Sequence, residues 1–279
     1  MKKAAILVFS LLSVYANSRW QHDTLKFSSG GSTLTGYFFD SHRPGSPTLL
    51  FTQGFMDSGD VWGIGKTLSA NGINVFTFDF RGCHKSGGLQ SLANSQEDLD
   101  AALITLKSKE LINRYGIDTH KIVLGGYSYG GHMSVLCCIR HPEVKRVVSI
   151  SGGDLGILAN SMAANSELKK KYTAFFQSIQ KPAGPVDFLF DDPVRELMEQ
   201  HVRFDLCRQA HRLAGKDVFL TGGMDDLTVS LEEHIIPVYR RFSKIENIKL
   251  TCKIYSCDHS YRNVSTELMN DIAIWIRDR

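Results

Sequence analysis

Ser128 lies in the segment GYSYG (126–130), which has the pattern G-x-S-x-G. In hydrolytic enzymes that use this pattern, the serine lies on a sharp turn between a strand and a helix, with its hydroxyl exposed. Residues 121–126 are typical of a buried strand and residues 129–139 of a helix, so Ser128 falls on the turn between them. The two glycines leave room where side chains would clash. This context favours a nucleophile over an idle serine in a glycine-rich turn.

A serine hydroxyl is a weak nucleophile, so it needs a base close by and a third group that orients the base. Two later segments supply these residue types in the chain order Ser, Asp, His. Asp225 and Asp226 follow one predicted strand, and His259 follows the last one. Since the carboxyl ends of parallel strands meet at one edge of a sheet, these residues are expected near Ser128. His259 is therefore the predicted base, and His84 is the alternative histidine near that edge.

A carbonyl under attack develops negative charge on its oxygen, which backbone amides can stabilise. One such donor is the residue after the nucleophile, here Tyr129. The second is expected from the loop TQGFMDSGDVW, where Gly54 permits a sharp turn and the amide of Phe55 follows it. The alternative is that this loop is an ordinary connection between a strand and a helix.

The elements that must position these residues alternate along the chain. Two segments around a Gly-Gly turn, 22–29 and 33–40, are typical of an antiparallel hairpin. Short segments that are often apolar on both faces follow, as expected of buried parallel strands: 47–54, 73–80, 121–126, 145–152, 216–223 and 248–256. The clearest helix between them is expected to begin at Ser95, with Asp98 completing a capping box. Together these patterns predict an α/β fold with a doubly wound, mostly parallel sheet.

One interval is longer than a simple crossover requires. Residues 154–214 separate two of the predicted parallel strands and are expected to form a small helical cap inserted into one domain that spans residues 17–279. The insert carries four phenylalanines that either shape a substrate pocket or only hold the cap together: Phe175, Phe176, Phe188 and Phe190.

Residues 1–16 have the pattern of a secretory signal peptide, with two lysines, an apolar run too short to span a bilayer, and small residues at the cleavage spacing. We therefore expect a secreted or periplasmic protein without a membrane span. Of the 32 basic residues, 30 lie beyond the signal, against 29 acidic residues, and no basic stripe predicts nucleic-acid binding. The six cysteines form no disulfide scaffold, and no spacing of cysteine or histidine predicts a metal or other cofactor. Oligomeric state is not predicted.

The segments TQGFMDSGDVW, FDFRGCHKSGG, GGYSYGG, TGGMDDLTV and DHS occur in the order found in the α/β-hydrolase superfamily, which the chain resembles along most of its length. Within that superfamily, SYGG followed by HPEVKRVVSISG resembles the prolyl-oligopeptidase-like peptidases and their related esterases. Gln53 and His84 depart from the usual residues at their positions and alter the expected pocket floor. Relatives with two consecutive aspartates use the first one, which implies Asp225 as the orienting acid, with Asp226 as the alternative.

The resemblance implies a serine hydrolase that acts on a small-molecule ester or a short peptide. The peptidases that the chain resembles carry a large propeller domain before the catalytic domain, and this sequence has no room for one ahead of its first parallel strand. Ester hydrolysis is therefore the favoured prediction. The alternatives are a peptidase, a cap-covered ligand-binding protein without activity, and non-hydrolytic chemistry with the same residues.

Overall fold

The computed structural model describes residues 22–55 and 57–278, so the expected signal peptide lies outside the described residues. Within this part of the chain, one sheet of eight strands has the order β1-β2-β4-β3-β5-β6-β7-β8. Its strands are β1 (Asp23–Ser29), β2 (Ser32–Phe39), β3 (Thr48–Thr52), β4 (Asn74–Phe78), β5 (Ile122–Tyr127), β6 (Arg146–Ile150), β7 (Asp217–Gly223) and β8 (Lys249–Tyr255). The pairs β1–β2 and β2–β4 are antiparallel, and the remaining neighbours are parallel. The predicted mostly parallel α/β sheet is confirmed.

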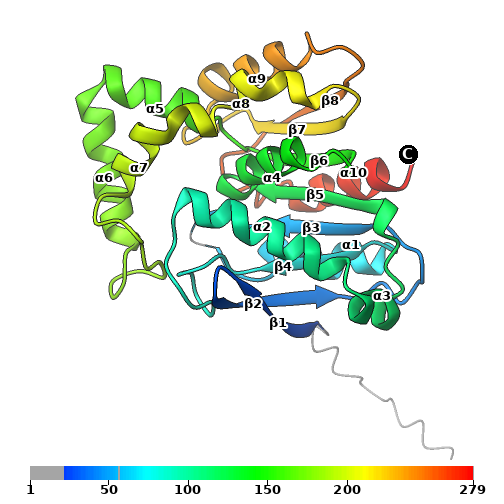
Figure 1. Cartoon of the computed structure of the whole chain (residues 1–279). Helices are drawn as coiled ribbons and strands as arrows, with labels where there is room; N and C mark the ends of the chain where they lie inside the picture. The colour runs from blue at the N-terminus through cyan, green and yellow to red at the C-terminus, as the bar shows by residue number, and fades with distance from the viewer. Residues whose placement is uncertain (1–21, 56, 279) are drawn as a thin grey trace, which may run out of the picture.

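Helices cover both faces of the sheet (Figure 1). One face packs against α1 (Ile64–Ala70) and α10 (Ser265–Arg277), and the other packs against α2 (Leu92–Leu106), α4 (Tyr129–Arg140) and α9 (Ile236–Phe242). A short helix, α3 (Lys109–Tyr115), follows α2. Every residue of the central strands β3, β4 and β5 is buried, which explains why their sequences are apolar on both faces.

The prediction that the first long helix begins at Ser95 is wrong. Helix α2 begins at Leu92, and Ser91 is its N-cap, because the Asn94 amide donates to Ser91 Oγ at 3.0 Å. Asp98 does not complete a capping box, since its carboxylate accepts two hydrogen bonds from Arg81 in the loop after β4. The Arg81 side chain donates through Nε to Asp98 Oδ1 at 2.6 Å, and the Arg81 amide donates to Oδ2 at 2.8 Å. The buried ion pair thus ties α2 to the sheet.

Residues 154–214, called here the cap segment, connect β6 to β7 mainly through helices. They are α5 (Leu155–Ala164), α6 (Ser166–Ile179), α7 (Pro193–Gln200), η3 (His201–Phe204), α8 (Leu206–Gln209) and η4 (Ala210–Leu213). Figure 1 shows α5, α6 and α7 beyond the carboxyl ends of the parallel strands, where the predicted catalytic loops emerge. The cap segment is therefore placed to cover those loops.

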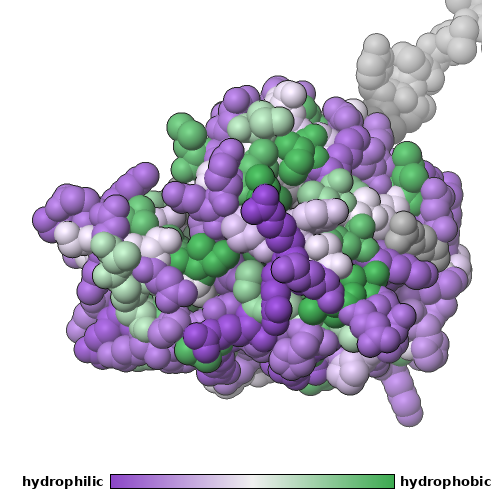
Figure 2. Space-filling model, turned by 90° about the horizontal axis from the view of Figure 1, so that it is seen from above, coloured by the Kyte–Doolittle hydropathy of each residue, from purple (hydrophilic) through white to green (hydrophobic). Residues whose placement is uncertain are grey.

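No helix among the described residues is both long and apolar enough to cross a membrane. The face seen from above in Figure 2 is largely hydrophilic, with separate apolar groups between the polar ones. The exposed large hydrophobic side chains include Tyr239 on α9 and Ile254 on β8. All six cysteines are free thiols, including Cys252 and Cys257 near the end of the last strand.

The buried ion pair between Arg81 and Asp98 gives a first prediction. Asp98→Ala leaves the Arg81 guanidinium buried without its main partner. We therefore expect the free energy of unfolding to fall by about 3 to 5 kcal/mol. Urea unfolding followed by circular dichroism measures the change. Glu97→Gln is the matched control, since Glu97 also contacts Arg81 at 2.7 Å but is exposed, and its loss should cost under about 1 kcal/mol. Equal losses in the two variants would contradict the assignment.

Candidate active site

Ser128 occupies the turn between β5 and α4, as predicted, and its backbone is strained. Its φ of 54° and ψ of −119° lie where residues with a side chain rarely occur. The chain can make this turn because a Cβ on Gly126 would lie 2.3 Å from the Gly130 backbone, and one on Gly130 would lie 2.2 Å from Thr52 O. The two glycines of the motif are thus required by close backbone contacts, and Ser128 is held at the end of the strand.

His259 lies beside Ser128, with its Nε2 atom 3.0 Å from Ser128 Oγ. The loop after β8 that carries His259 is fixed by two aromatic side chains. The Tyr127 hydroxyl donates to the His259 carbonyl at 2.8 Å, and the Trp62 indole donates to the Ser260 carbonyl at 2.8 Å. These contacts hold the imidazole where it can take a proton from the serine hydroxyl.

Asp226, and not Asp225, orients the imidazole. The Oδ2 atom of Asp226 lies 2.7 Å from His259 Nδ1, and Asp226 is buried, whereas Asp225 is exposed. The reason is backbone pairing beyond the ends of β7 and β8: the Asp225 amide donates to the Cys257 carbonyl at 2.9 Å. This pairing turns the Asp225 side chain outward and the next one inward. The choice of Asp225 from relatives is therefore corrected, and the alternative Asp226 takes its place in the geometry.

Asp226 also stabilises its own loop. Its Oδ1 atom accepts hydrogen bonds from the amides of Thr228 and Val229 at 2.9 and 2.8 Å. A carboxylate that accepts hydrogen bonds from the amides two and three residues ahead is a common local pattern. Both aspartates are followed by such amides, so this pattern does not distinguish them in the sequence. Burial alone would raise the pKa of Asp226, but the hydrogen bonds from His259 and the Val229 amide hold this pKa below its ordinary value. Asp226 is therefore ionised at neutral pH and favours a proton on His259 Nδ1.

Three further hydroxyl groups, which the sequence did not predict, form a hydrogen-bonded group next to the Asp226 carboxylate. Ser151 Oγ donates to Asp226 Oδ2 at 2.9 Å and lies 2.9 Å from the Tyr261 hydroxyl, which in turn lies 3.1 Å from Thr221 Oγ1. Ser151 and Tyr261 both have positive φ angles, 42° and 54°, and both are fully buried. Strained, buried hydroxyls of this kind indicate a position fixed for a purpose, but no sequence pattern singles them out.

Phe55 and Tyr129, the predicted amide donors, both lie at the cavity that contains Ser128. Tyr129 is the first residue of α4, so its amide has no acceptor within the helix. The two rings contact each other with centroids 3.8 Å apart. Gln53, which departs from the superfamily pattern, donates from Nε2 to the Gly59 carbonyl at 2.9 Å and to Thr77 Oγ1 at 2.6 Å. Gln53 thereby braces the loop that carries Phe55.

His84, the alternative base, takes no part in this arrangement. Its amide donates to the Pro185 carbonyl of the cap segment at 3.1 Å, and its φ is 45°. Neither nitrogen of its ring bonds Ser128 within the described residues. The structure therefore brings His259 and not His84 to the serine.

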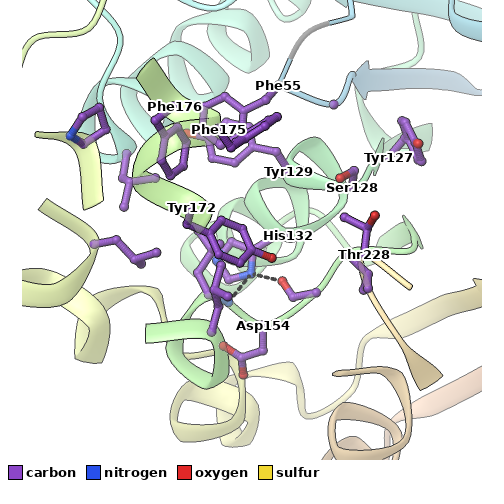
Figure 3. A pocket seen from close by; sticks show the side chains of 18 of the residues that line it. Phe55, Tyr127, Ser128, Tyr129, His132, Asp154, Tyr172, Phe175, Phe176 and Thr228 are labelled. Atoms are coloured by element: carbon purple, nitrogen blue, oxygen red, sulfur yellow. Dashed lines mark hydrogen bonds between the residues drawn. The ribbon is translucent and has the colours of Figure 1, made fainter. Parts of the chain in front are cut away.

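The cavity over Ser128 has a volume of about 360 Å³ and lies between the sheet edge and the cap segment (Figure 3). Aromatic rings form much of its wall: Phe55 contacts Phe176 at 5.4 Å and Phe188 at 6.5 Å between centroids. Of the four phenylalanines named from the sequence, Phe175, Phe176 and Phe188 line the cavity, and Phe190 is absent from its lining. A pocket of this size and character suits a small organic group.

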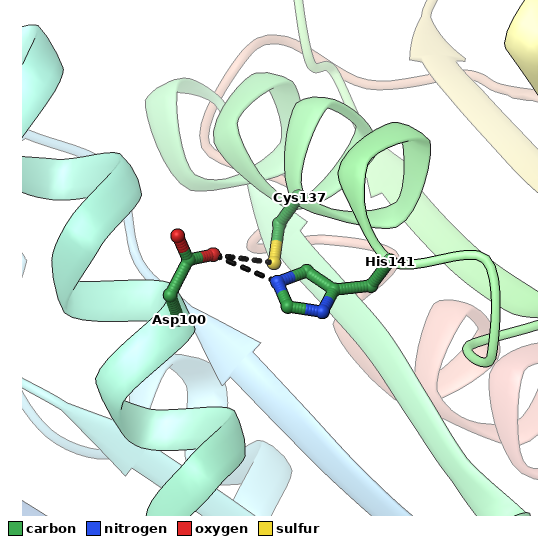
Figure 4. A group of neighbouring side chains, drawn as sticks. All are labelled: Asp100, Cys137 and His141. Carbon is green, nitrogen blue, oxygen red and sulfur yellow. Dashed lines mark hydrogen bonds and ion pairs between the residues drawn. The ribbon is translucent and has the colours of Figure 1, made fainter.

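Two other clusters in the described residues contain side chains of the types that bind metals. In one, Asp100 Oδ1 accepts from His141 Nε2 at 2.9 Å and from Cys137 Sγ at 3.8 Å (Figure 4), and Arg140 donates to the same oxygen. In the other, the carboxylates of Asp154 and Asp205 accept backbone amides at helix starts. The Asp100 carboxylate accepts from Arg140 and His141, so ion pairing explains the first cluster. The carboxylates of Asp154 and Asp205 accept hydrogen bonds from backbone amides, so helix capping explains the second.

The chain superimposes on several solved structures over most of its length. The esterase Pf2001 of Pyrococcus furiosus aligns with a TM-score of 0.67 at 19% identity, covering 92% of this chain and 91% of that one. Est1E of Butyrivibrio proteoclasticus, solved with ferulic acid bound, aligns with a TM-score of 0.63 at 16% identity, covering 91% and 98%. The chain has the α/β-hydrolase fold. Residues 47–185 also match the family described as alpha/beta hydrolase fold.

Curated relatives match over shorter segments. The chain is 30% identical over 193 residues to alpha/beta hydrolase domain-containing protein 17B of Xenopus tropicalis, covering 65% of this chain and 62% of that protein. It is 27% identical over 124 residues to the uncharacterized protein YfhR of Escherichia coli, covering 42% of each. The aligned segments span less than two thirds of each of these relatives.

The two aspartates give a second prediction. Asp226→Asn keeps the size of the side chain but removes the charge that stabilises a protonated His259, so turnover of p-nitrophenyl acetate should fall by about 10³- to 10⁴-fold. Asp225→Asn is the matched control and should leave turnover close to that of the unmodified protein, because its side chain faces solvent. Thermal melts verify that both variants are folded. A larger loss of turnover in the Asp225 variant would show that Asp225, and not Asp226, is the carboxylate that orients His259.

Ser151 gives a third prediction. Ser151→Ala removes one of the donors to Asp226 Oδ2, so we expect kcat to fall by about tenfold with little change in KM. Ser149→Ala is the control, since Ser149 is a buried serine on β6, which ends one residue before Ser151, and its hydroxyl has no partner among the described residues. Equal kcat values in the two variants would show that Ser151 serves folding alone.

Proposed function

We propose that the protein hydrolyses carboxylic esters through Ser128, His259 and Asp226. The observation that supports this proposal is the continuous chain of hydrogen bonds from Ser128 Oγ to His259 to Asp226 Oδ2, with distances of 3.0 and 2.7 Å, at the wall of an aromatic cavity. Nucleophile, base and orienting carboxylate are the groups that acyl transfer to serine requires.

In the first half of the proposed reaction, His259 Nε2 removes the proton from Ser128 Oγ as this oxygen attacks the ester carbonyl. The carbonyl oxygen becomes negative and faces the amides of Tyr129 and Phe55. Asp226 stabilises the positive charge on the imidazole and keeps its Nδ1 atom protonated. When the intermediate collapses, the bond to the alcohol oxygen breaks, and His259 returns its proton to the departing alcohol.

The second half removes the acyl group from Ser128. His259, now neutral, takes a proton from a water molecule, and the hydroxide attacks the acyl carbonyl. The same two amides donate hydrogen bonds to the negative oxygen, the bond to Ser128 Oγ breaks, and the serine recovers its proton from His259. The products are one carboxylic acid and one alcohol.

An ester is favoured over a peptide as the substrate. The cavity holds a small group under the cap segment, and several structural neighbours at low identity are esterases by name, including Pf2001 and acetyl xylan esterase 1 of Thermoanaerobacterium. We also propose that residues 1–16 direct the protein out of the cytoplasm and are removed. N-terminal sequencing of the exported protein would test this, because an intact Met1 would contradict it.

The proposal gives a fourth prediction. Ser128→Ala should lower kcat for p-nitrophenyl esters by about 10⁴- to 10⁶-fold, with little change in thermal stability, since only a hydroxyl is lost. His259→Ala should lower kcat by a similar factor because the two residues act as a unit. Steady-state rates on esters of increasing chain length, run beside aminoacyl arylamides, make the measurement.

Labelling with a fluorophosphonate distinguishes the remaining alternatives. The unmodified protein should react with the reagent and the Ser128→Ala variant should not. Faster turnover of the arylamides than of the esters would favour a peptidase. A protein that neither reacts with the fluorophosphonate nor turns over any substrate would be a ligand-binding protein.

A further inference from the structure

The cavity over Ser128 contains a polar patch among its aromatic rings. The polar patch consists of His132 on α4, Tyr172 on α6 and His234 on η5 (Leu231–Ile235), and all three line the cavity. None of the three belongs to the proposed catalytic group. The cavity is therefore more than a hydrophobic pocket, and these polar atoms need partners.

His132 presents an unsatisfied acceptor. It is 1% exposed, and its Nδ1 atom lies 2.9 Å from the Gly153 carbonyl. The Leu155 amide also points at Nδ1, but at 3.4 Å this contact is much longer than the one to the Gly153 carbonyl. Because a carbonyl only accepts, we place the proton of this imidazole on Nδ1, which leaves a lone pair on Nε2. Burial lowers the pKa of His132 to about 3, so the ring is neutral. Its Nε2 atom has no hydrogen-bond partner in the described part of the protein.

His234 also lies close to Gly153. A Cβ placed on Gly153 would lie 3.2 Å from His234 Nδ1. This nitrogen also lacks a partner within the described residues, although His234 is only 7% exposed. Burial lowers the pKa of His234, so it too is neutral at physiological pH. Two buried imidazole nitrogens without partners are costly for a protein, which suggests that a ligand supplies the missing hydrogen bonds.

Tyr172 adds a donor from the cap segment. Its side chain lies in the cavity near His132 (Figure 3), and its hydroxyl makes no hydrogen bond within the described residues. Burial, together with the nearby charges of Glu233 and Asp226, raises the pKa of Tyr172. The hydroxyl therefore stays protonated and can donate at neutral pH.

We propose that the cavity accepts a group with an apolar ring or chain that carries a hydroxyl, and that the polar patch binds this hydroxyl. This inference rests on the proposed ester hydrolysis and names its substrate class. The apolar part would pack against Phe55, Phe176 and Phe188. The hydroxyl would donate to His132 Nε2 and accept from Tyr172, which matches the one donor and two acceptor sites of an alcohol or phenol.

Other polar groups fit the patch less well. A carboxylate has no proton to give to His132 Nε2, and the two neutral imidazoles provide no positive charge to balance it. A plain hydrocarbon leaves His132 Nε2 and the Tyr172 hydroxyl without partners. The donor and acceptor pattern thus selects for a hydroxylated group over an unsubstituted or an acidic one.

Matched pairs of esters test the proposal. The first pair places the hydroxyl on the acyl side: p-nitrophenyl 3-(4-hydroxyphenyl)propanoate against p-nitrophenyl 3-phenylpropanoate. The second places it on the alcohol side: 2-(4-hydroxyphenyl)ethyl acetate against 2-phenylethyl acetate. We expect kcat/KM to favour the hydroxylated member of one pair by about tenfold or more, as two recovered hydrogen bonds would give.

Variants connect the preference to the patch. Tyr172→Phe removes one hydroxyl and should reduce the ratio of kcat/KM within the favoured pair severalfold, and His132→Leu should reduce it as well. Should the buried His132 variant fail to fold, Tyr172→Phe still decides the question. Tyr239→Phe, on an exposed tyrosine of α9, is the control and should leave the ratio unchanged.

Equal kcat/KM values within both pairs would overturn the hydroxyl proposal and leave ester hydrolysis intact. A preference that survives in both variants would also overturn it. If the protein turned over no ester at all, the proposed function would fail, and calorimetric binding of the paired esters to Ser128→Ala would test the pocket separately. Tighter binding of the hydroxylated esters would support the polar patch, and equal binding would overturn it.

Discussion

The close approach of backbone to backbone at the turn around Ser128 is the constraint on which the rest of the site depends. Gly130 lies against the Thr52 carbonyl at the end of β3, so even one methyl group would force the strand and α4 apart. The same contact fixes the start of α4, and with it the amide of Tyr129. The positive φ of Ser128 is tolerated because the surrounding strands determine the turn from both sides.

The geometry at the other side of Ser128 depends on pairing between β7 and β8. Hydrogen bonds continue beyond both strands, from the Met224 amide to Tyr255 and from the Asp225 amide to Cys257. Met224 and Asp225 form a turn after β7 with both side chains exposed, and the Asp226 amide closes this turn onto the Gly223 carbonyl at 3.3 Å. The side chain of Asp226 then faces inward. The buried hydroxyls of Ser151 and Tyr261 then fill the space behind its carboxylate. The pairing beyond β7 and β8 therefore determines the orientation of the His259 imidazole, because it positions the carboxylate of Asp226.

These dependences explain which features the sequence could predict. The strands and the positions of Ser128 and His259 follow from local patterns, since buried parallel strands are apolar on both faces and glycines mark the turn. The choice between Asp225 and Asp226 depends on pairing with a segment 32 residues further along the chain, at Cys257. The predicted capping box between Ser95 and Asp98 is absent for a similar reason, because Arg81, outside the helix, binds Asp98, and the N-cap of α2 is Ser91. Ser151 and Tyr261 meet only in the folded protein.

The cap segment differs from a loosely attached lid because it is bonded to the sheet domain close to the cavity. Glu196 on α7 accepts hydrogen bonds from the first two amides of α2, those of Leu92 and Ala93, at 2.9 and 3.2 Å. A buried carboxylate at a helix start is favourable because the helix dipole and the unpaired amides both stabilise its charge. The Gln90 amide adds a bond to the Asp187 carbonyl at 2.7 Å. The aromatic walls and Tyr172 are therefore held in a fixed position relative to Ser128, as the proposed function requires if the sheet edge supplies the reacting groups and the cap segment selects the substrate.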